Sequence, residues 1–169
     1  MERLWSPWRL AYVTGTSASH ACIFCEALPQ ADAESLVVFR GTTCFVILNL
    51  FPYNSGHLMV VPNRHIGTLT DASGPELTEL MRLTRRAEMA ITEAYRPQGL
   101  NVGINLGRPA GAGIVDHVHI HVVPRWTGDT NFMSVVGDVR VLPEEPKATA
   151  GRLRPIFARL QQDDRLAAG

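Results

Sequence analysis

Residues 117–122 read His-Val-His-Ile-His-Val, and no other stretch constrains the fold as strongly. Strict alternation of histidine with β-branched aliphatic residues is the period-two pattern of a half-buried β-strand. It predicts that His117, His119 and His121 share one face of a sheet while the aliphatic residues face a core. Because a strand rises about 3.3 Å per residue, neighbouring imidazoles would begin about 6.6 Å apart. The pattern therefore predicts a row of reactive groups on a rigid support.

Imidazoles are versatile at neutral pH, so this row has several chemical interpretations. A neutral imidazole can attack phosphorus, and a second group on its other nitrogen can orient it. The row can thus supply a nucleophile and the groups that position it. A metal-binding strand, or a polar face without chemistry, is the competing interpretation of the same spacing.

Size and charge place the chain among ordinary globular proteins. Its 169 residues are most simply one domain, and 16 Lys plus Arg balance 16 Asp plus Glu. This balance argues against a basic nucleic-acid surface or a polybasic membrane anchor, so we expect neither partner. The first residues lack the apolar core of a signal peptide, and no apolar run is long enough to span a bilayer. We therefore expect a cytoplasmic protein.

Runs rich in β-forming residues and bounded by turn residues predict four further strands, at residues 36–40, 43–50, 57–62 and 100–106. Ser73 and Glu76 form a capping box that begins a helix ending near Tyr95. Its predicted buried stripe comprises Leu77, Leu80, Met81, Thr84, Ala87, Ile91, Ala94 and Tyr95. Arg82, Arg85 and Arg86 are expected on its solvated face. Residues 143–147 are expected to break regular structure before a terminal helix at 151–166.

A glycine-rich loop, residues 107–113, precedes the histidine row. Such a loop allows backbone N–H groups to approach a phosphate closely. It is not a Walker loop because no Gly-Lys-Ser/Thr follows, and by itself the signal is weak.

Two of the three cysteines are spaced as Cys22-Ile-Phe-Cys25. In a cytoplasmic chain this spacing is more typical of metal binding or redox chemistry than of a structural disulfide. Such a knuckle together with two histidines is a common tetrahedral zinc set. A redox pair and a pair of unmetallated buried thiols are the alternatives.

The histidine row also resembles the His-φ-His-φ-His-φ-φ signature, where φ is apolar, of the histidine triad (HIT) superfamily of nucleotide hydrolases and transferases. Other motifs follow in the family's order: Asn49 after a strand, residues 56–62 (Gly-His-Leu-Met-Val-Val-Pro), Asn105 before the glycine-rich loop, and Pro124-Arg125. Residues 4–9, 101–107 and 123–132 further resemble the bacterial diadenosine tetraphosphate phosphorylase branch.

The resemblance implies a covalent mechanism. The middle histidine, His119, would attack the α-phosphorus of a nucleotide, and water or inorganic phosphate would resolve the nucleotidyl-histidine intermediate. His117 and His121 would orient the ring or assist proton transfer. The substrate-binding residues implied are Asn49 for the ribose, Asn105 for phosphate, Gly111 and Gly113 of the glycine-rich loop, and Trp126.

The resemblance also implies a zinc site, since some family members bind zinc through this arrangement. Cys22 and Cys25 would be joined by His65, in Pro-Asn-Arg-His, and by His117, so that His117 braces the strand and His119 and His121 do the chemistry. His20 and Cys44 are weaker alternative ligands, and His57 is expected to be a structural hydrogen-bonding residue.

One departure from the family pattern concerns the residues before the triad. Many members carry a polar pair such as Gln-Ser there, whereas this chain has Ala112-Gly113-Ile114. A hydroxyl donor to phosphate is therefore absent, and backbone N–H groups would have to substitute.

We therefore expect a single α+β domain of the HIT fold over residues 1–169, with an extension at 1–21, a core at 22–126 and a C-terminal region at 127–169. The fold would be a mainly five-stranded antiparallel sheet with one long helix and a C-terminal helix, forming a homodimer at least. The expected cofactors are a structural zinc and Mg²⁺ bound with the substrate.

The leading functional hypothesis is cleavage of a dinucleoside polyphosphate at an α-phosphate, by phosphorolysis or hydrolysis. Hydrolysis of adenosine phosphoramidates or aminoacyl adenylates is a second enzymatic hypothesis. A nucleotide-binding interaction protein with little turnover is the third, motivated by the missing polar pair.

Overall fold

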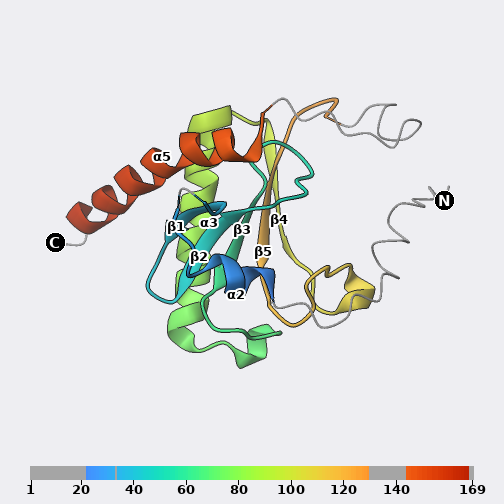
Figure 1. Ribbon diagram of the computed structural model, residues 1–169. Coiled ribbons are helices and arrows are strands. Elements are labelled where there is room, and N and C mark those ends of the chain that lie inside the picture. The colour runs from blue at the N-terminus through green and yellow to red at the C-terminus, as the bar shows by residue number, and fades with distance from the viewer. Residues whose placement is uncertain (1–21, 33, 130–143, 168–169) are drawn as a thin grey trace.

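The computed structural model describes residues 22–32, 34–129 and 144–167. A five-stranded antiparallel sheet in the order β1-β2-β3-β5-β4 organises them (Figure 1). Its strands are β1 (Val37–Arg40), β2 (Cys44–Leu48), β3 (Leu58–Pro62), β4 (Gly99–Ile104) and β5 (Ile120–Arg125). The predicted α+β class and five-stranded sheet are confirmed. The predicted extension at 1–21, with His20, and most of the segment after Trp126 lie outside the described residues.

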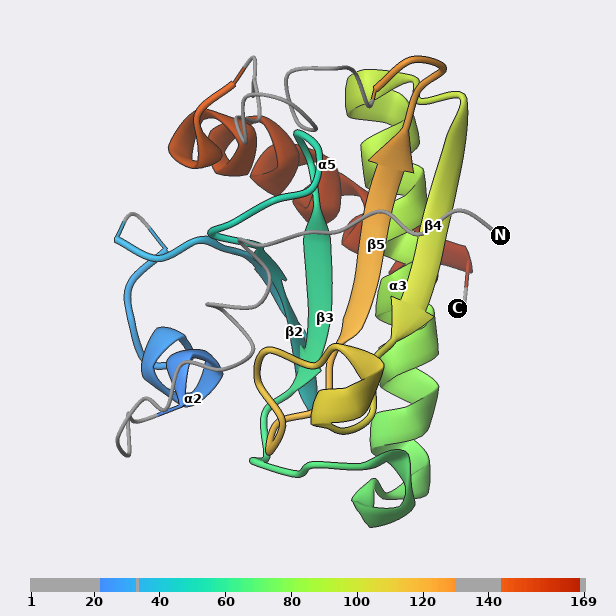
Figure 2. The same cartoon turned by 90° about the vertical axis from the view of Figure 1, so that its right-hand side faces the viewer.

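The long helix α3 (Gly74–Tyr95) runs alongside the sheet, and α5 (Pro146–Ala167) packs against α3 and β1 (Figures 1 and 2). The predicted capping box is present, because Glu76 N–H donates to the Ser73 side chain and the Glu76 side chain accepts from Ser73 N–H. Helix α5 begins at Pro146, so the predicted break at 143–147 is wrong for its last residues. Proline is tolerated in a first helical turn, where its missing N–H has no partner to lose.

The buried face of α3 is rotated from the predicted stripe. Leu77 and Met81 are exposed, whereas Leu83 and Ala90 are buried. Arg86 is also buried, with its guanidinium carbon 4.9 Å from the Phe39 ring centroid, so its prediction as a solvated residue is wrong. Apolar residues lie on two overlapping faces of the helix, and packing against the sheet determines which of these faces is buried.

The two faces of the sheet carry different cores. The first face packs under α3 and α5 and includes Leu58, Val60, Ile120 and Val122. The second face carries a smaller cluster: Phe24, Val37, Phe45, Ile47, Met59 and Val61. Phe24 belongs to α2 (Ile23–Ala27), a five-residue helix that is too short for periodicity to predict.

The histidine row is only partly a strand. Strand β5 begins at Ile120, three residues later than predicted, because its partner β3 ends in Pro62, which has no N–H to continue the ladder. The preceding segment is held instead by a 2.7 Å hydrogen bond from Val118 N–H to the Ile66 carbonyl. Alternation nevertheless holds, since Ile120 and Val122 face the first core and the three histidines face the second cluster.

Glu76 ties the start of α3 to the loop that carries His65. Its buried carboxylate accepts two 2.7 Å hydrogen bonds from Arg64 and one of 2.8 Å from Ser73 N–H. The Arg64 hydrogen bonds, helped by the Ser73 N–H, lower the pKa of Glu76 to about 2.

Glu76→Gln is therefore expected to destabilise the protein in a pH-dependent manner. Because the folded-state pKa is depressed, the carboxylate contributes fully above its ordinary pKa of 4.5 and loses its contribution as the pH falls through about 2. Urea titrations should show a wild-type advantage in unfolding free energy that is constant above about pH 5 and shrinks in acid. Glu88→Gln, at an exposed position of α3, is the control and should show no such gap. A gap that does not vary with pH would contradict this role.

Among the described residues, no helix combines the length and apolar character needed to cross a membrane.

Candidate active site and metal centre

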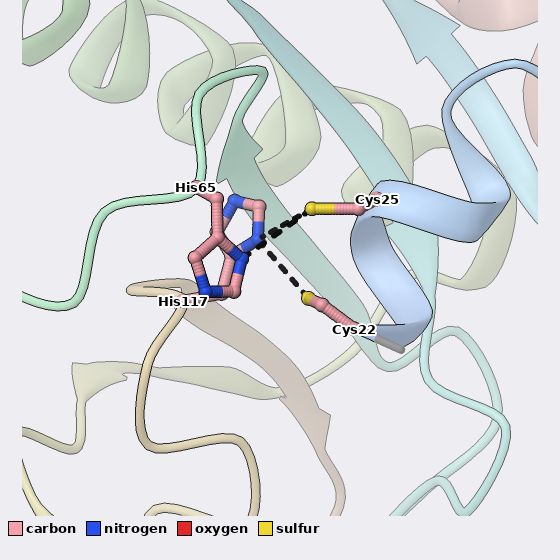
Figure 3. A group of neighbouring side chains, drawn as sticks. All are labelled: Cys22, Cys25, His65 and His117. Carbon is pink, nitrogen blue, oxygen red and sulfur yellow. Dashed lines mark hydrogen bonds between the residues drawn. The ribbon is translucent and has the colours of Figure 1, made fainter. Parts of the chain in front are cut away.

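Four metal-ligating side chains from three segments converge on the second face of the sheet (Figure 3). Cys22 and Cys25 belong to the α2 segment, His65 lies after β3, and His117 precedes β5, and their ligand atoms all lie within 4.8 Å of one another. Cys22 Sγ lies 3.2 Å from His117 Nδ1. Cys25 Sγ lies 3.4 Å from His65 Nδ1 and 3.7 Å from His117 Nδ1. These four residues can hold a metal ion.

The geometry and chemistry of this donor set fit zinc. With Zn–S near 2.3 Å and Zn–N near 2.05 Å, a tetrahedral ion separates a sulfur and a nitrogen ligand by about 3.6 Å. The S···N distances of 3.2, 3.4 and 3.7 Å are close to that value. Burial and the neighbouring Cys22 thiol raise the pKa of Cys25, and a cation between the two sulfurs would offset their repulsion as thiolates. The alternative ligand Cys44 is buried in the core of the first face and does not join the group.

His117 is oriented as a metal ligand by a second partner. Its Nε2 lies 2.9 Å from the Pro62 carbonyl oxygen, which only accepts hydrogen bonds. The proton must therefore sit on Nε2, and the Nδ1 lone pair faces the two sulfurs. The ring is fully buried.

His119 is oriented as a nucleophile by the same logic. Its Nδ1 lies 2.9 Å from the His117 carbonyl oxygen, so the proton sits on Nδ1. The lone pair is consequently on Nε2, the nitrogen that remains available for attack.

His57 and His121 form a pair beside the nucleophile. His57 Nδ1 accepts the Tyr53 N–H at 3.1 Å, so its proton is on Nε2, which lies 3.0 Å from His121 Nδ1. His121 therefore accepts at Nδ1 and carries its proton on Nε2. The centroids of the His119 and His121 rings are 4.7 Å apart. His57 thus fixes the tautomer of His121.

Burial keeps the triad neutral. It lowers the pKa values of His117 and His119. It also lowers the pKa of His121 to about 4, and the charge that His119 carries when protonated adds to this effect. A neutral His119 retains the lone pair that a nucleophile needs at physiological pH.

The structure brings Asn49 to this group. Its N–H donates to the His57 carbonyl at 3.0 Å, and its Nδ2 lies 3.4 Å from His57 Nδ1. Its Oδ1 accepts the Phe51 N–H, which sets the amide at the rim of the second face.

The glycine-rich loop lies beside the N-terminal end of β5 (Figure 2). Gly111 has a φ of 94°, a left-handed conformation that favours glycine, and its carbonyl accepts the Asn105 Nδ2–H at 3.5 Å. Gly113 is exposed, whereas Ala112 is buried and Ile114 packs on the second cluster. Of the positions that carry a polar pair in the resembled family, Ile114 therefore makes an apolar contact with the second cluster.

Trp126 is not brought to the triad. It follows β5, at the end opposite His119, so the two are roughly 20 Å apart at a rise of about 3.3 Å per residue. Its N–H donates to Asp129 at 3.2 Å, within a turn that Arg125 also closes. Trp126 therefore lies away from the triad, and its predicted contact with a substrate stays a prediction.

Two residues with direct contacts to the triad were not predicted as site residues. His57 was expected to be a structural hydrogen-bonding residue, and it does form hydrogen bonds, but one of its partners is His121 of the triad. Side chains alternate along β3, so His57 lies on the same face as Met59, the residue that pairs with His121. Phe24 lies between the two cysteines, and its ring centroid is 5.3 Å from His117 and 5.0 Å from His119. The local sequence around Phe24 does not predict a contact with residues almost a hundred positions away.

The fold and the histidine geometry are those of a histidine triad protein, and comparison with known proteins agrees. The model of the HIT domain matches residues 30–128, and this chain belongs to the HIT domain family. It is similar to the AP-4-A phosphorylase of Mycobacterium tuberculosis, with 43% identity over 167 residues that cover 94% of this chain and 86% of that relative. It is 35% identical to the asymmetrical bis(5'-nucleosyl)-tetraphosphatase of Schizosaccharomyces pombe over 56% of this chain and 52% of that protein.

Solved structures show the same fold. The crystal structure of a Zn-bound histidine triad family protein from Mycobacterium smegmatis matches with a TM-score of 0.67 and 28% identity. The match covers 85% of this chain and 97% of that one.

Proposed function

We propose that this protein is a nucleotidyl transferase that cleaves dinucleoside polyphosphates, such as diadenosine tetraphosphate, at an α-phosphate. The observation that carries the proposal is the tautomer of His119, whose Nδ1–H donates to the His117 carbonyl and leaves the Nε2 lone pair for attack. The phosphorylase and tetraphosphatase relatives support the substrate class.

In the first step, His119 Nε2 attacks the α-phosphorus. A P–N bond forms, the P–O bond to the rest of the polyphosphate breaks, and a nucleoside polyphosphate leaves. The Nδ1–H remains on the ring, and the His117 carbonyl oxygen that accepts it stabilises the positive charge that develops on the imidazole. In the second step, an oxygen of inorganic phosphate or of water attacks the same phosphorus and the P–N bond breaks. His119 leaves as the neutral ring with its Nδ1–H, and the proton that an attacking water loses passes to solvent.

His121 and Asn49 would serve the substrate from the same face. His121 would donate its Nε2–H to an oxygen on the phosphorus or on the leaving group, in the tautomer that His57 fixes. Asn49 would bind the ribose, and the N–H groups of the loop around Gly111 and Gly113 would bind phosphate, with Asn105 holding that loop. Because the triad is neutral, Mg²⁺ would accompany the polyphosphate to balance its charge.

We also propose that the metal held by the four Cys and His ligands is zinc. Zinc with four protein ligands is structural, since no position is left for substrate. It would tie the α2 segment to the His65 loop and to the start of the histidine row.

Turnover of diadenosine tetraphosphate with and without inorganic phosphate, in the presence of Mg²⁺, tests the function. Phosphorolysis predicts that turnover requires phosphate and that one product is a nucleoside diphosphate. Turnover that is unaffected by phosphate would remove the phosphorylase assignment in favour of hydrolysis. Faster turnover of adenosine phosphoramidates would favour the second enzymatic hypothesis, and no turnover of any of these would favour a binding protein.

His57→Ala is expected to lower kcat by about 10–100-fold, as removal of a residue that orients an active-site histidine typically does. His57→Gln should retain more activity because its amide N–H can replace Nε2–H as the donor to His121 Nδ1. Steady-state kinetics of both variants checks this order. Wild-type kcat in His57→Ala would contradict the proposed role of His57.

We further propose a cytoplasmic homodimer of single-domain protomers. Strand β4 is an edge of the described sheet, and Val102 and Leu106 are exposed on and beside it. Unpaired edges with apolar side chains readily pair with another chain. Sedimentation should give twice the 18.6 kDa protomer mass, and Val102→Lys should shift it toward the monomer. A monomeric wild type would refute the dimer.

The proposed cytoplasmic location is supported by the cysteine ligands, because thiolates suit a reducing compartment.

A further inference from the structure

The metal centre and the nucleophile are connected by one aromatic side chain. Phe24 sits on α2 between Cys22 and Cys25 and is 1% exposed. Its ring meets His117 edge-on, at an interplanar angle of 80°, and meets His119 at 54° with centroids 5.0 Å apart. The same short helix therefore supplies two candidate metal ligands and a packing surface for the nucleophilic ring.

A second connection runs through the main chain. His119 Nδ1–H donates to the carbonyl of His117, whose own side chain is a candidate ligand. The ring of His119 thus makes a hydrogen bond to the His117 carbonyl and a packing contact with the Phe24 ring. Both interactions come from residues at or next to the candidate metal ligands.

The packing contact has a specific task that the hydrogen bond alone does not perform. The outer torsion of a histidine side chain is broad and roughly two-fold, so one hydrogen bond leaves the ring free to rock and is the single interaction that a flip would break. A flip would exchange the nitrogen and carbon positions and remove the Nε2 lone pair from its direction of attack. A large rigid ring in van der Waals contact opposes that motion.

We propose that Phe24 is a positioning residue through which the Cys22–Cys25 knuckle holds the His119 ring in its attacking orientation. This inference rests on the proposed function in assigning attack to His119. It predicts that the knuckle contributes to the rate of the chemical step as well as to stability.

The test compares Phe24→Leu with Phe45→Leu. Phe45 is fully buried in the same cluster, but it lies on β2, which β3 separates from β5. Both variants remove the same aromatic volume, so a loss of general packing should affect them alike. Phe24→Met is a second variant for use if Phe24→Leu does not fold.

Four measurements apply to each variant: zinc per chain, KM from steady-state kinetics, the rate at which radiolabelled substrate labels the protein in a single turnover, and the tautomer of His119 from long-range ¹H–¹⁵N correlation spectra. The His119 signals are assigned by their loss in His119→Gln. For Phe24→Leu we expect unchanged zinc, unchanged KM and labelling slowed about 10–100-fold, since small misplacements of a reacting group cost this much. The His119 spectrum should change from a single Nδ1–H tautomer to a mixture. Phe45→Leu should label at the wild-type rate and keep the single tautomer.

Wild-type labelling by Phe24→Leu, or equal losses in the two variants, would overturn the proposal. Absence of labelling in the wild type would instead refute the proposed function. The tautomer comparison would still decide whether Phe24 holds the ring, because it needs no turnover.

Discussion

His119→Ala is expected to eliminate the covalent nucleotidyl-protein and to lower kcat by about 10⁴-fold or more, as loss of a nucleophile does in other covalent enzymes. The reason is geometric. Of the three triad imidazoles, His119 is the one whose Nδ1–H is tied to a main-chain carbonyl and whose Nε2 keeps its lone pair. His117 turns its lone pair toward the sulfurs, and His121 turns its own toward His57.

Acid-quench trapping with radiolabelled diadenosine tetraphosphate measures the effect. His121→Ala is the comparison, because it removes a neighbouring imidazole and leaves the nucleophile in place. It should still accumulate labelled protein, although about 10²–10³-fold more slowly, because the hydrogen bond from His121 Nε2–H to a phosphate oxygen is lost. Equal labelling of His119→Ala and the wild type would assign the attack to a different residue.

Loss of the metal centre is the second large effect. Protein purified without chelator should contain about one zinc per chain, and Cys22→Ser/Cys25→Ser should contain almost none. Structural zinc contributes about 10–16 kcal/mol of apparent binding free energy in small zinc domains. Even about 5 kcal/mol of that would lower Tm by about 10–20 °C in a domain of this size.

Metal analysis and calorimetry check both parts of this prediction. Cys44→Ala is the matched control, because it removes a buried thiol from the core of the first face. It should lose some stability and keep its zinc. Affinity for zinc should fall as the pH is lowered, since the ligands must release protons and the Cys25 pKa is already raised by burial and by Cys22. Wild-type protein with well below one metal per chain would refute the site.

Local patterns predicted much of the fold. The capping box at Ser73 and the β-rich runs that became strands each depend on interactions within a few residues. The predictions were less accurate where the structure depends on packing or pairing between elements that are distant in the sequence. Strand β5 starts late because Pro62, on a different strand, cannot donate, and α3 buries Leu83 rather than Met81 because the sheet selects the phase.

The sequence by itself determined which residue types were available: three histidines on one face, a Cys-x-x-Cys knuckle and a histidine in the loop after β3. The histidines have the same side chain and regular spacing, so their pattern alone does not distinguish them, and only the family resemblance assigned them different roles. Tertiary structure decided how they differ, because the hydrogen-bond partner of each ring determines which of its nitrogens carries the proton. These partners are the Pro62 carbonyl for His117, the His117 carbonyl for His119, and His57 for His121. Those partners lie on other strands or depend on local backbone direction, which only the folded chain determines.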